Sequence, residues 1–334
     1  MERASIKSQC SRDYFYTKNP VFEKAFGAVE GEQRTLLDNI IATTTPPAHR
    51  SADRSRLSGG IMLQAGRTAS AAAHADYLAN QFGKAMLKHH LTKEGNTELL
   101  EYLPQVEITV PHGVMEAIGQ NLAMAPLIDD LDCALFLNET NEDFLTSDHP
   151  IAMCNGLPGI RDTDRHTGFA SRGLIILYPI SPRALLFLSD AEAYKVEKNS
   201  SGSSTLKRPQ DVIDLNLAQC RQAFENLYFA SPARVQTTLQ AFRRRANILR
   251  PRPSELTESS VQSEGRRGVL LALSPRVPRL SLPKPVHVRH AAKTGKYKVG
   301  DAVARDPVRV QLVHARLRKL REEATKMGEQ QRSE

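Results

Sequence analysis

Hydrophobic residues in the first half of the chain recur every three to four positions, the period of an amphipathic α-helix. The pattern predicts a first helix over residues 22–40, ended by the Pro-containing loop at 43–47. The Ala-rich residues 57–91 predict one long helix or two, and a further helix is expected over 114–122, ending near Pro126. We therefore expect a helical N-terminal half.

The middle of the chain changes to short apolar runs, which are typical of β-strands. Residues 133–138 and 143–147 flank a polar turn and predict a first hairpin, and residues 173–179 and 183–189 predict a second. Because these runs are apolar at successive positions, we expect helices to cover both faces of the strands. The prediction is a small antiparallel sheet of two hairpins packed by helices.

Helical spacing returns after a Ser- and Asn-rich stretch at 199–204, which is typical of a flexible loop. One helix is expected to begin near Asp211 and another to cover 235–249. Helices, then strands, then helices indicate the α+β class. We expect residues 1–250 to form a single α+β domain, followed by an extension at 251–334.

The charge of the chain changes the picture of that extension. The whole sequence carries 45 Lys and Arg against 37 Asp and Glu, a formal net charge of +8. Residues 240–334 hold 22 basic and 9 acidic residues, so they carry +13 and the preceding residues carry −5. The extension is rich in Pro and Arg and nearly free of aromatic residues, so it can bury little surface to offset chain entropy. It is expected to be largely unstructured, with one amphipathic helix near 308–327.

Several classes of protein are excluded by composition. No apolar run approaches the roughly 18 residues that span a bilayer, and the N-terminus has no apolar stretch typical of a secretory signal. The four cysteines are scattered without a Cys-x-x-Cys pair, which argues against a zinc site and a disulfide framework. Nucleophile-elbow, phosphate-loop and dinucleotide-binding motifs are absent from the sequence. We expect a cytoplasmic protein with reduced thiols.

Four ordered blocks carry a resemblance to a known family. They are the stretch from Lys7 through 13–16 to the 23–30 helix, Gln64-Ala-Gly-Arg67-Thr68, Phe144-Leu-Thr-Ser-Asp-His-Pro-Ile151, and Leu177-Tyr-Pro-Ile-Ser-Pro182 with the later Leu215-Asn216 helix. The third block is similar to the signature F-[IL]-T-S-D-x-P-[VI]. The set resembles the bacterial domain-of-unknown-function family numbered 4238 over roughly residues 7–231. The resemblance implies a fold boundary before the extension and implies no established activity.

This sequence departs from the family pattern at its start. Members commonly open with a His-rich segment resembling H-H-x-V-P, and this chain has none. One interpretation is therefore a truncated, inactive family member.

The polar run at residues 146–150 is the first candidate site, because it follows an apolar strand that can hold side chains in place. Asp148 could accept a proton or bind a cation, and His149 could act as a base or a ligand, with Thr146 and Ser147 contacting substrate. The alternative is structural, with Ser147 and Asp148 closing turns at the strand end.

A second candidate group lies on the predicted N-terminal helices. Gln64 and Arg67 are three residues apart and share one helical face, with Thr68 following as a hydroxyl donor. Arg67 could pair with Asp148 across the domain, in a site or as a purely architectural contact. The combined hypothesis is a polar pocket in which a hydrolase uses Asp148 as base or metal ligand, with His149 assisting and Arg67 stabilising negative charge.

Other polar clusters give weaker hypotheses. Asp129, Asp130 and Asp132 are expected to form a solvated connection rather than a metal site, since no Gly-turn loop accompanies them. The pairs His89-His90 and His287-His290 lack matching ligands, so we predict no metal, and the cofactor is unknown.

The basic residues of the C-terminal part define a non-enzymatic alternative. They are Arg243, Arg244, Arg245, Arg316, Arg318, Lys319 and Arg321. They could contact nucleic acid through its phosphates, and a basic amphipathic helix can equally meet an anionic membrane surface or a partner protein. A solvated arm without a dedicated partner is the remaining interpretation.

Overall fold

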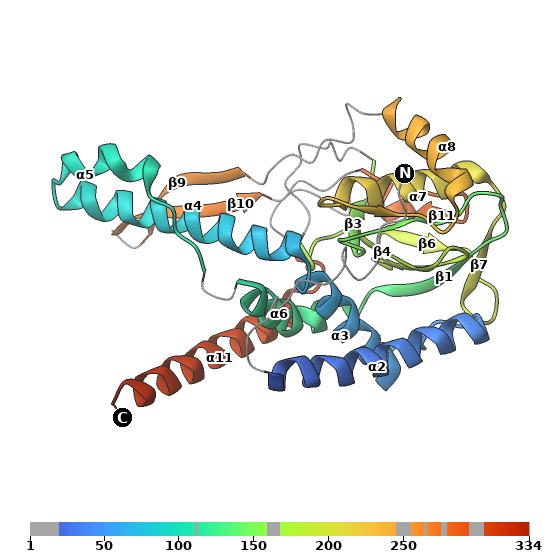
Figure 1. The fold of residues 1–334 in the computed structure, drawn as a ribbon, viewed down its shortest axis with the longest axis horizontal. Helices are drawn as coiled ribbons and strands as arrows, with labels where there is room; N and C mark the ends of the chain where they lie inside the picture. The colour runs from blue at the N-terminus through green and yellow to red at the C-terminus, as the bar shows by residue number, and fades with distance from the viewer. Residues whose placement is uncertain are drawn as a thin grey trace.

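The computed structural model describes residues 20–110, 113–158, 168–244, 255–263, 266–274, 279–293 and 304–333 (Figure 1). The N-terminal half contains the helices α2 (Pro20–Thr43), α3 (Ala52–Gly66), α4 (Ala69–Lys93), α5 (Thr97–Tyr102) and α6 (Gly113–Met124), with the 3₁₀ turns η1 (Leu103–Gln105) and η2 (Ala125–Ile128). The Ala-rich stretch is thus two helices, interrupted at Arg67 and Thr68. The structure therefore contains both helix and sheet, and this part of the prediction is confirmed.

The main sheet has five strands in the order β3 (Ala152–Asn155), β4 (Leu174–Ser181), β5 (Ala184–Ser189), β1 (Asp132–Asn138) and β7 (Ser203–Leu206). The predicted β4–β5 hairpin is confirmed. β1 runs antiparallel to β5 but parallel to β7. The sheet is therefore mixed, and the prediction of a small antiparallel sheet of two hairpins was wrong.

The first predicted hairpin does not form, because of the position of β1 in the sheet. β1 has β5 on one edge and β7 on the other, so no edge is left for the residues that follow it. β2 (Thr146–Ser147) pairs instead with β8 (Leu227–Tyr228). The polar run 146–150 therefore begins in the β2–β8 pair and leads directly into β3, an edge strand of the main sheet.

Apolar side chains on both faces of the sheet are covered, as the sequence predicted. Leu186 and Leu188 of β5 belong to a cluster with residues of α2 and α3. Leu185 and Phe187 face the other way and pack with α7 (Pro209–Gln222), β6 (Tyr194–Val196) and β11 (Val286–Val288). The sheet thus lies between an N-terminal helical layer and a layer built around α7 (Figure 1).

The C-terminal part adds α8 (Pro232–Arg243), the antiparallel pair β9 (Glu255–Ser263) and β10 (Arg266–Ser274), β11, α10 (His290–Lys293) and α11 (Pro307–Ser333). β11 pairs with β6. Leu280, Val286 and Val313 are each at most 5 % exposed. The described parts of 251–334 therefore form secondary structure and bury apolar residues. The low aromatic content of this segment had indicated a largely unstructured extension, but the residues it buries are aliphatic. The expected boundary at 250 lies outside the described residues.

Three arginines converge on the backbone carbonyls of η2 and the residues that follow it. Arg309 Nη1 donates to Pro126 O at 2.8 Å, and Arg305 Nη2 donates to Leu127 O at 2.6 Å. The fully buried Arg54 of α3 donates to Ile128 O and Leu131 O, both at 3.1 Å. Cationic donors at a helical C-terminus are favourable. They tie α3 and α11 to one turn.

Candidate functional site

The break between α3 and α4 fixes two of the candidate side chains. The Arg67 N–H closes α3 by donating to Leu63 O at 3.0 Å. Thr68 is the N-cap of α4, and its Oγ1 accepts a hydrogen bond from the Ala71 N–H at 3.1 Å. This cap starts a new helix and holds the Thr68 hydroxyl in a buried position.

Arg67 is held by partners on two helices. Its Nε donates to Gln64 Oε1 at 2.7 Å, and its Nη1 pairs with the Glu30 carboxylate of α2. Burial raises the pKa of the nearby Tyr178 phenol, and the positive charge of Arg67 opposes that rise. The Arg67 side chain remains 27 % exposed. The predicted Gln64–Arg67 pair is present, but the carboxylate that binds Arg67 is Glu30 rather than Asp148.

The run from Thr146 to Pro150 is fastened to α7. Gln219, a fully buried residue of α7, donates through Nε2 to Pro150 O at 2.7 Å, and its Oε1 lies 3.3 Å from Ser147 Oγ. Ser147 Oγ also accepts from the His149 N–H at 3.2 Å, which is the turn geometry expected from the structural alternative. Thr146 lies in β2, opposite Tyr228.

The Asp148 carboxylate is engaged by three backbone N–H groups. Oδ1 accepts from Phe224 at 2.9 Å, and Oδ2 accepts from Glu225 at 2.7 Å and from Asn226 at 2.9 Å. These bonds anchor the loop between α7 and β8. Three acceptor positions of the carboxylate are thus occupied by backbone donors, so the geometry favours the structural interpretation.

His149 meets the α3–α4 break. Its Nδ1 lies 2.9 Å from Thr68 Oγ1, whereas its Nε2 has no hydrogen-bond partner among the described residues. Burial lowers the pKa of His149, Asp148 raises it, and His74 lowers it further. The imidazole is therefore neutral near pH 7, with one nitrogen fixed by Thr68.

The structure joins the two candidate groups through the Thr68–His149 contact. It adds Glu30 and Tyr178, which the sequence analysis did not select as site residues. Both residues lie in blocks that carry the family resemblance, and their membership of those blocks is the feature of the sequence that could have marked them as site residues.

Four of the other residues considered as metal ligands are engaged in ion pairs. Asp130 binds Arg305, Asp132 binds Lys198, His90 lies by Glu94, and His287 lies by Glu197. Across the described ranges, no group of three or more His, Cys, Asp or Glu residues could hold a metal ion.

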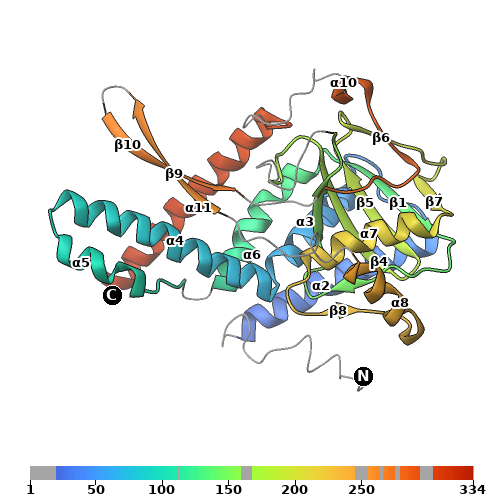
Figure 2. The same ribbon diagram turned by 90° about the horizontal axis from the view of Figure 1, so that it is seen from above.

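The basic residues do not form one surface. Arg243 and Arg244 are exposed at the end of α8, whereas Arg316, Arg318 and Lys319 are exposed on α11. α8 and α11 lie far apart in both views (Figures 1 and 2). Arg245 and the Arg321 side chain lie outside the described parts. Within the described parts, no helix is long and apolar enough to cross a bilayer.

These features define an α+β protein whose polar centre lies where the α3–α4 break meets the segment after β2. The chain belongs to the family described as a protein of unknown function (DUF4238), which matches residues 1–233. Neither the search of curated proteins nor the search of solved structures gave a match.

Proposed function

We propose that the protein is a hydrolase in which His149 acts as the general base. The observation that carries this proposal is the state of the imidazole. Thr68 holds Nδ1, burial lowers the pKa, and Nε2 has no partner among the described residues. A neutral imidazole with one fixed nitrogen can take a proton from water through the other nitrogen.

Arg67 has the role of stabilising the negative charge that develops on the substrate. Glu30 and Gln64 fix the Arg67 guanidinium before substrate binds. Donors that are already in position stabilise the charge of a transition state more effectively than donors that must first reorient. Tyr178 is a phenol donor close to Arg67, while Thr68, Thr146 and Ser147 complete the polar surroundings. Asp148 has a positioning role, because its carboxylate holds the 224–226 loop that supports the strand end.

The pH dependence of this mechanism has a definite sign. A base whose pKa is lowered by burial is already deprotonated at neutral pH. The rate is therefore constant near pH 7 and falls only when the pH drops through the lowered pKa of His149.

Chromogenic carboxyl esters, thioesters, phosphate monoesters and phosphodiesters test the proposal. The wild-type protein should hydrolyse at least one class, and His149→Asn should lower kcat by roughly 10²–10⁴-fold, the usual contribution of a general base. Arg67→Lys keeps the charge but loses the fork and should also lower kcat. Equal rates for wild-type and His149→Asn protein with every class would overturn the assignment.

Nucleic-acid contact through the basic residues is the second proposed function. Its support is the exposure of Arg316, Arg318 and Lys319 on one helix. Deleting residues 251–334 would remove buried core residues, so the test uses the full chain with these three changed to Gln. If they contact phosphates, DNA or RNA affinity should fall and its dependence on salt should become shallower. An unchanged salt slope would remove α11 from consideration.

A further inference from the structure

A row of three amide side chains on α7 is hydrogen-bonded to the segment that contains His149. The three are spaced three residues apart, which places them on adjacent turns of one side of the helix: Asn216, Gln219 and Gln222. Asn216 bonds residues 143–145, Gln219 bonds residues 147–150, and Gln222 bonds Met153. The segment 143–153 therefore runs along α7, and each amide fixes one part of it.

Gln219 is the amide nearest to His149 along this row, and it holds the chain on both sides of the histidine. Its Nε2 donates to Pro150 O at 2.7 Å, directly after His149. Its Oε1 accepts from Ser147 Oγ at 3.3 Å, and Ser147 Oγ in turn accepts from the His149 N–H at 3.2 Å. One side chain thus fixes the backbone before, at and after His149.

The burial of Gln219 indicates that these bonds, rather than packing, account for the residue type. The side chain is fully buried, and apolar residues occupy other buried positions of α7 at Val212, Leu215 and Ala218. An aliphatic residue would fill the same space without the cost of burying an amide. An amide has both donors and an acceptor, and its bonds are directional, so it sets the position of the 147–150 backbone along the helix.

Asp148 completes the attachment from the other direction. Its carboxylate binds the loop that follows α7, so α7 holds the His149 segment and the segment holds the loop after α7. Thr68, the partner of the His149 imidazole, belongs instead to the α3–α4 break. The His149–Thr68 contact therefore joins two separately anchored parts of the molecule.

We propose that Gln219 is the positioning residue that holds the His149 imidazole against Thr68. Its effect on rate rests on the proposed function, in which His149 is the general base, whereas its effect on the imidazole does not. Loss of both Gln219 bonds frees the backbone next to His149, and a displacement of about 1 Å can lower a rate by about 10²-fold. Gln219 acts through the backbone and takes no part in the proton transfer itself.

Nitrogen-15 NMR of the histidine side chains in the full-length protein tests the positioning directly. The His149 signals are identified among the 10 histidines by their loss in His149→Asn. In the wild type we expect one imidazole tautomer, because Thr68 contacts only Nδ1. In Gln219→Leu we expect both tautomers, and the pKa of His149, which burial lowers, should move back toward about 6.5. With a substrate that the wild type hydrolyses, kcat should fall about 100-fold with little change in KM.

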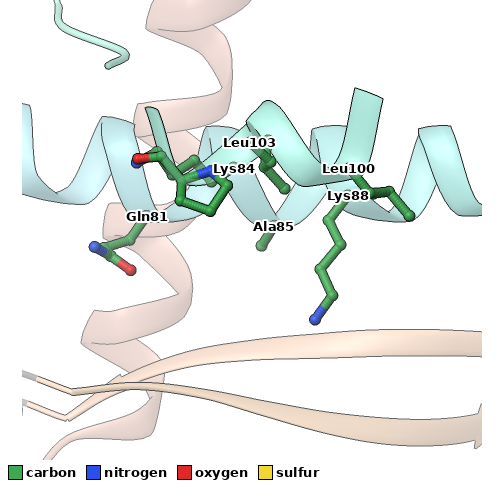
Figure 3. Close-up of a pocket in the computed structure, with 7 residues that line it drawn as sticks. Gln81, Lys84, Ala85, Lys88, Leu100 and Leu103 are labelled. Atoms are coloured by element: carbon green, nitrogen blue, oxygen red, sulfur yellow. The ribbon is translucent and has the colours of Figure 1, made fainter. Parts of the chain in front are cut away.

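Two control variants should leave the His149 signals and kcat as in the wild type. Gln222→Leu removes the same kind of amide from the same helix, and its partner Met153 lies beyond the His149 turn. The second control lies in a cavity of about 350 Å³ between α4 and α5 (Figure 3), which is distant from α7 in Figure 1. Ala85→Leu fills part of that cavity, on the helix whose N-cap is Thr68.

Circular dichroism shows whether each variant is folded. If Gln219→Leu does not fold, Ser147→Ala breaks one of the two links and should change the His149 signals in the same direction by a smaller amount. Wild-type His149 signals in the folded variant, or an equal change in Gln222→Leu, would overturn the proposal.

The two readouts separate this proposal from the proposed function. A changed imidazole with unchanged kcat would support the positioning role of Gln219 and contradict the role of His149 as base. If the wild type hydrolyses none of the substrate classes, the hydrolase proposal fails, and the NMR result still decides the role of Gln219.

Discussion

The contact between Arg305 and Asp130 makes a quantitative prediction about how the C-terminal part contributes to stability. Arg305 Nε and Nη2 bind the two Asp130 carboxylate oxygens at 2.6 and 2.9 Å, a bidentate arrangement. The same guanidinium donates to the carbonyls of Leu127, Ser171 and Phe169 at 2.6, 2.8 and 3.1 Å. Changing Arg305 to Ala leaves a carboxylate and three carbonyls without these donors.

The size of the effect follows from burial. The Arg305 side chain is 6 % exposed and that of Asp130 is 21 % exposed. Removing one partner of a buried pair costs about 3–5 kcal/mol. Because water can reach Asp130, we expect a loss of about 3 kcal/mol for Arg305→Ala. Arg305→Lys should lose less, since it keeps the charge but cannot make the bidentate contact.

Urea unfolding of the full-length protein, monitored by far-ultraviolet circular dichroism, measures this loss of unfolding free energy. A double-mutant cycle with Asp130→Asn should give a coupling energy of about 0.5–3 kcal/mol. Arg316→Ala, on the exposed face of α11, is the control and should change stability by less than about 0.5 kcal/mol. An unchanged unfolding midpoint for Arg305→Ala would show that residues 304–333 do not belong to the cooperative unit, and the reasoning would then be wrong.

Three further predictions concern single side chains. Burial lowers the pKa of His149 in the folded protein, so the unfolded chain binds a proton more readily and stability should fall as the pH drops below about 6.5. Urea unfolding at pH 8 and pH 5 should show a smaller loss of stability for His149→Asn than for the wild type. Asp148→Ala should cost about 2 kcal/mol by the same assay, since three charge-assisted bonds are lost at a partly exposed site. Tyr194→Phe should cost about 2–4 kcal/mol, because its buried hydroxyl bonds Gly156 N and Gly173 O, while Tyr102→Phe at an exposed position should be neutral.

The sequence predicts those elements whose formation depends on neighbours along the chain. α6 and α7 each bury residues at helical spacing, and the β4–β5 hairpin closes through a short local turn. β7 could not be predicted in this way. It contains Ser203 and Ser204 and reads as part of a polar loop, yet it pairs with the central strand β1. That pairing depends on distant residues rather than on an apolar pattern.

The candidate site likewise contains some contacts that the sequence could suggest and others that depend on tertiary packing. The order of the family blocks was enough to associate Thr68 and His149 with one site, and the two side chains are in contact. The partner of Arg67 depends on how α2 crosses α3, which no local pattern specifies. The partners of Asp148 are backbone N–H groups, which carry no residue-type signal at all.

The convergence of Arg305 on η2 also has a consequence for the time course of synthesis. Arg305 and Asp130 are 175 positions apart in the chain. At roughly 5–20 residues per second, the ribosome makes Asp130 about 9–35 s before it makes Arg305. During that interval the sheet and the helices around η2 can form, but Asp130 and the Leu127 carbonyl lack their Arg305 donors and must be solvated. The attachment of η2 to the 169–171 segment through Arg305 is thus an event that follows translation of most of the chain, and a nascent chain stalled before residue 305 is expected to be the species most in need of a chaperone.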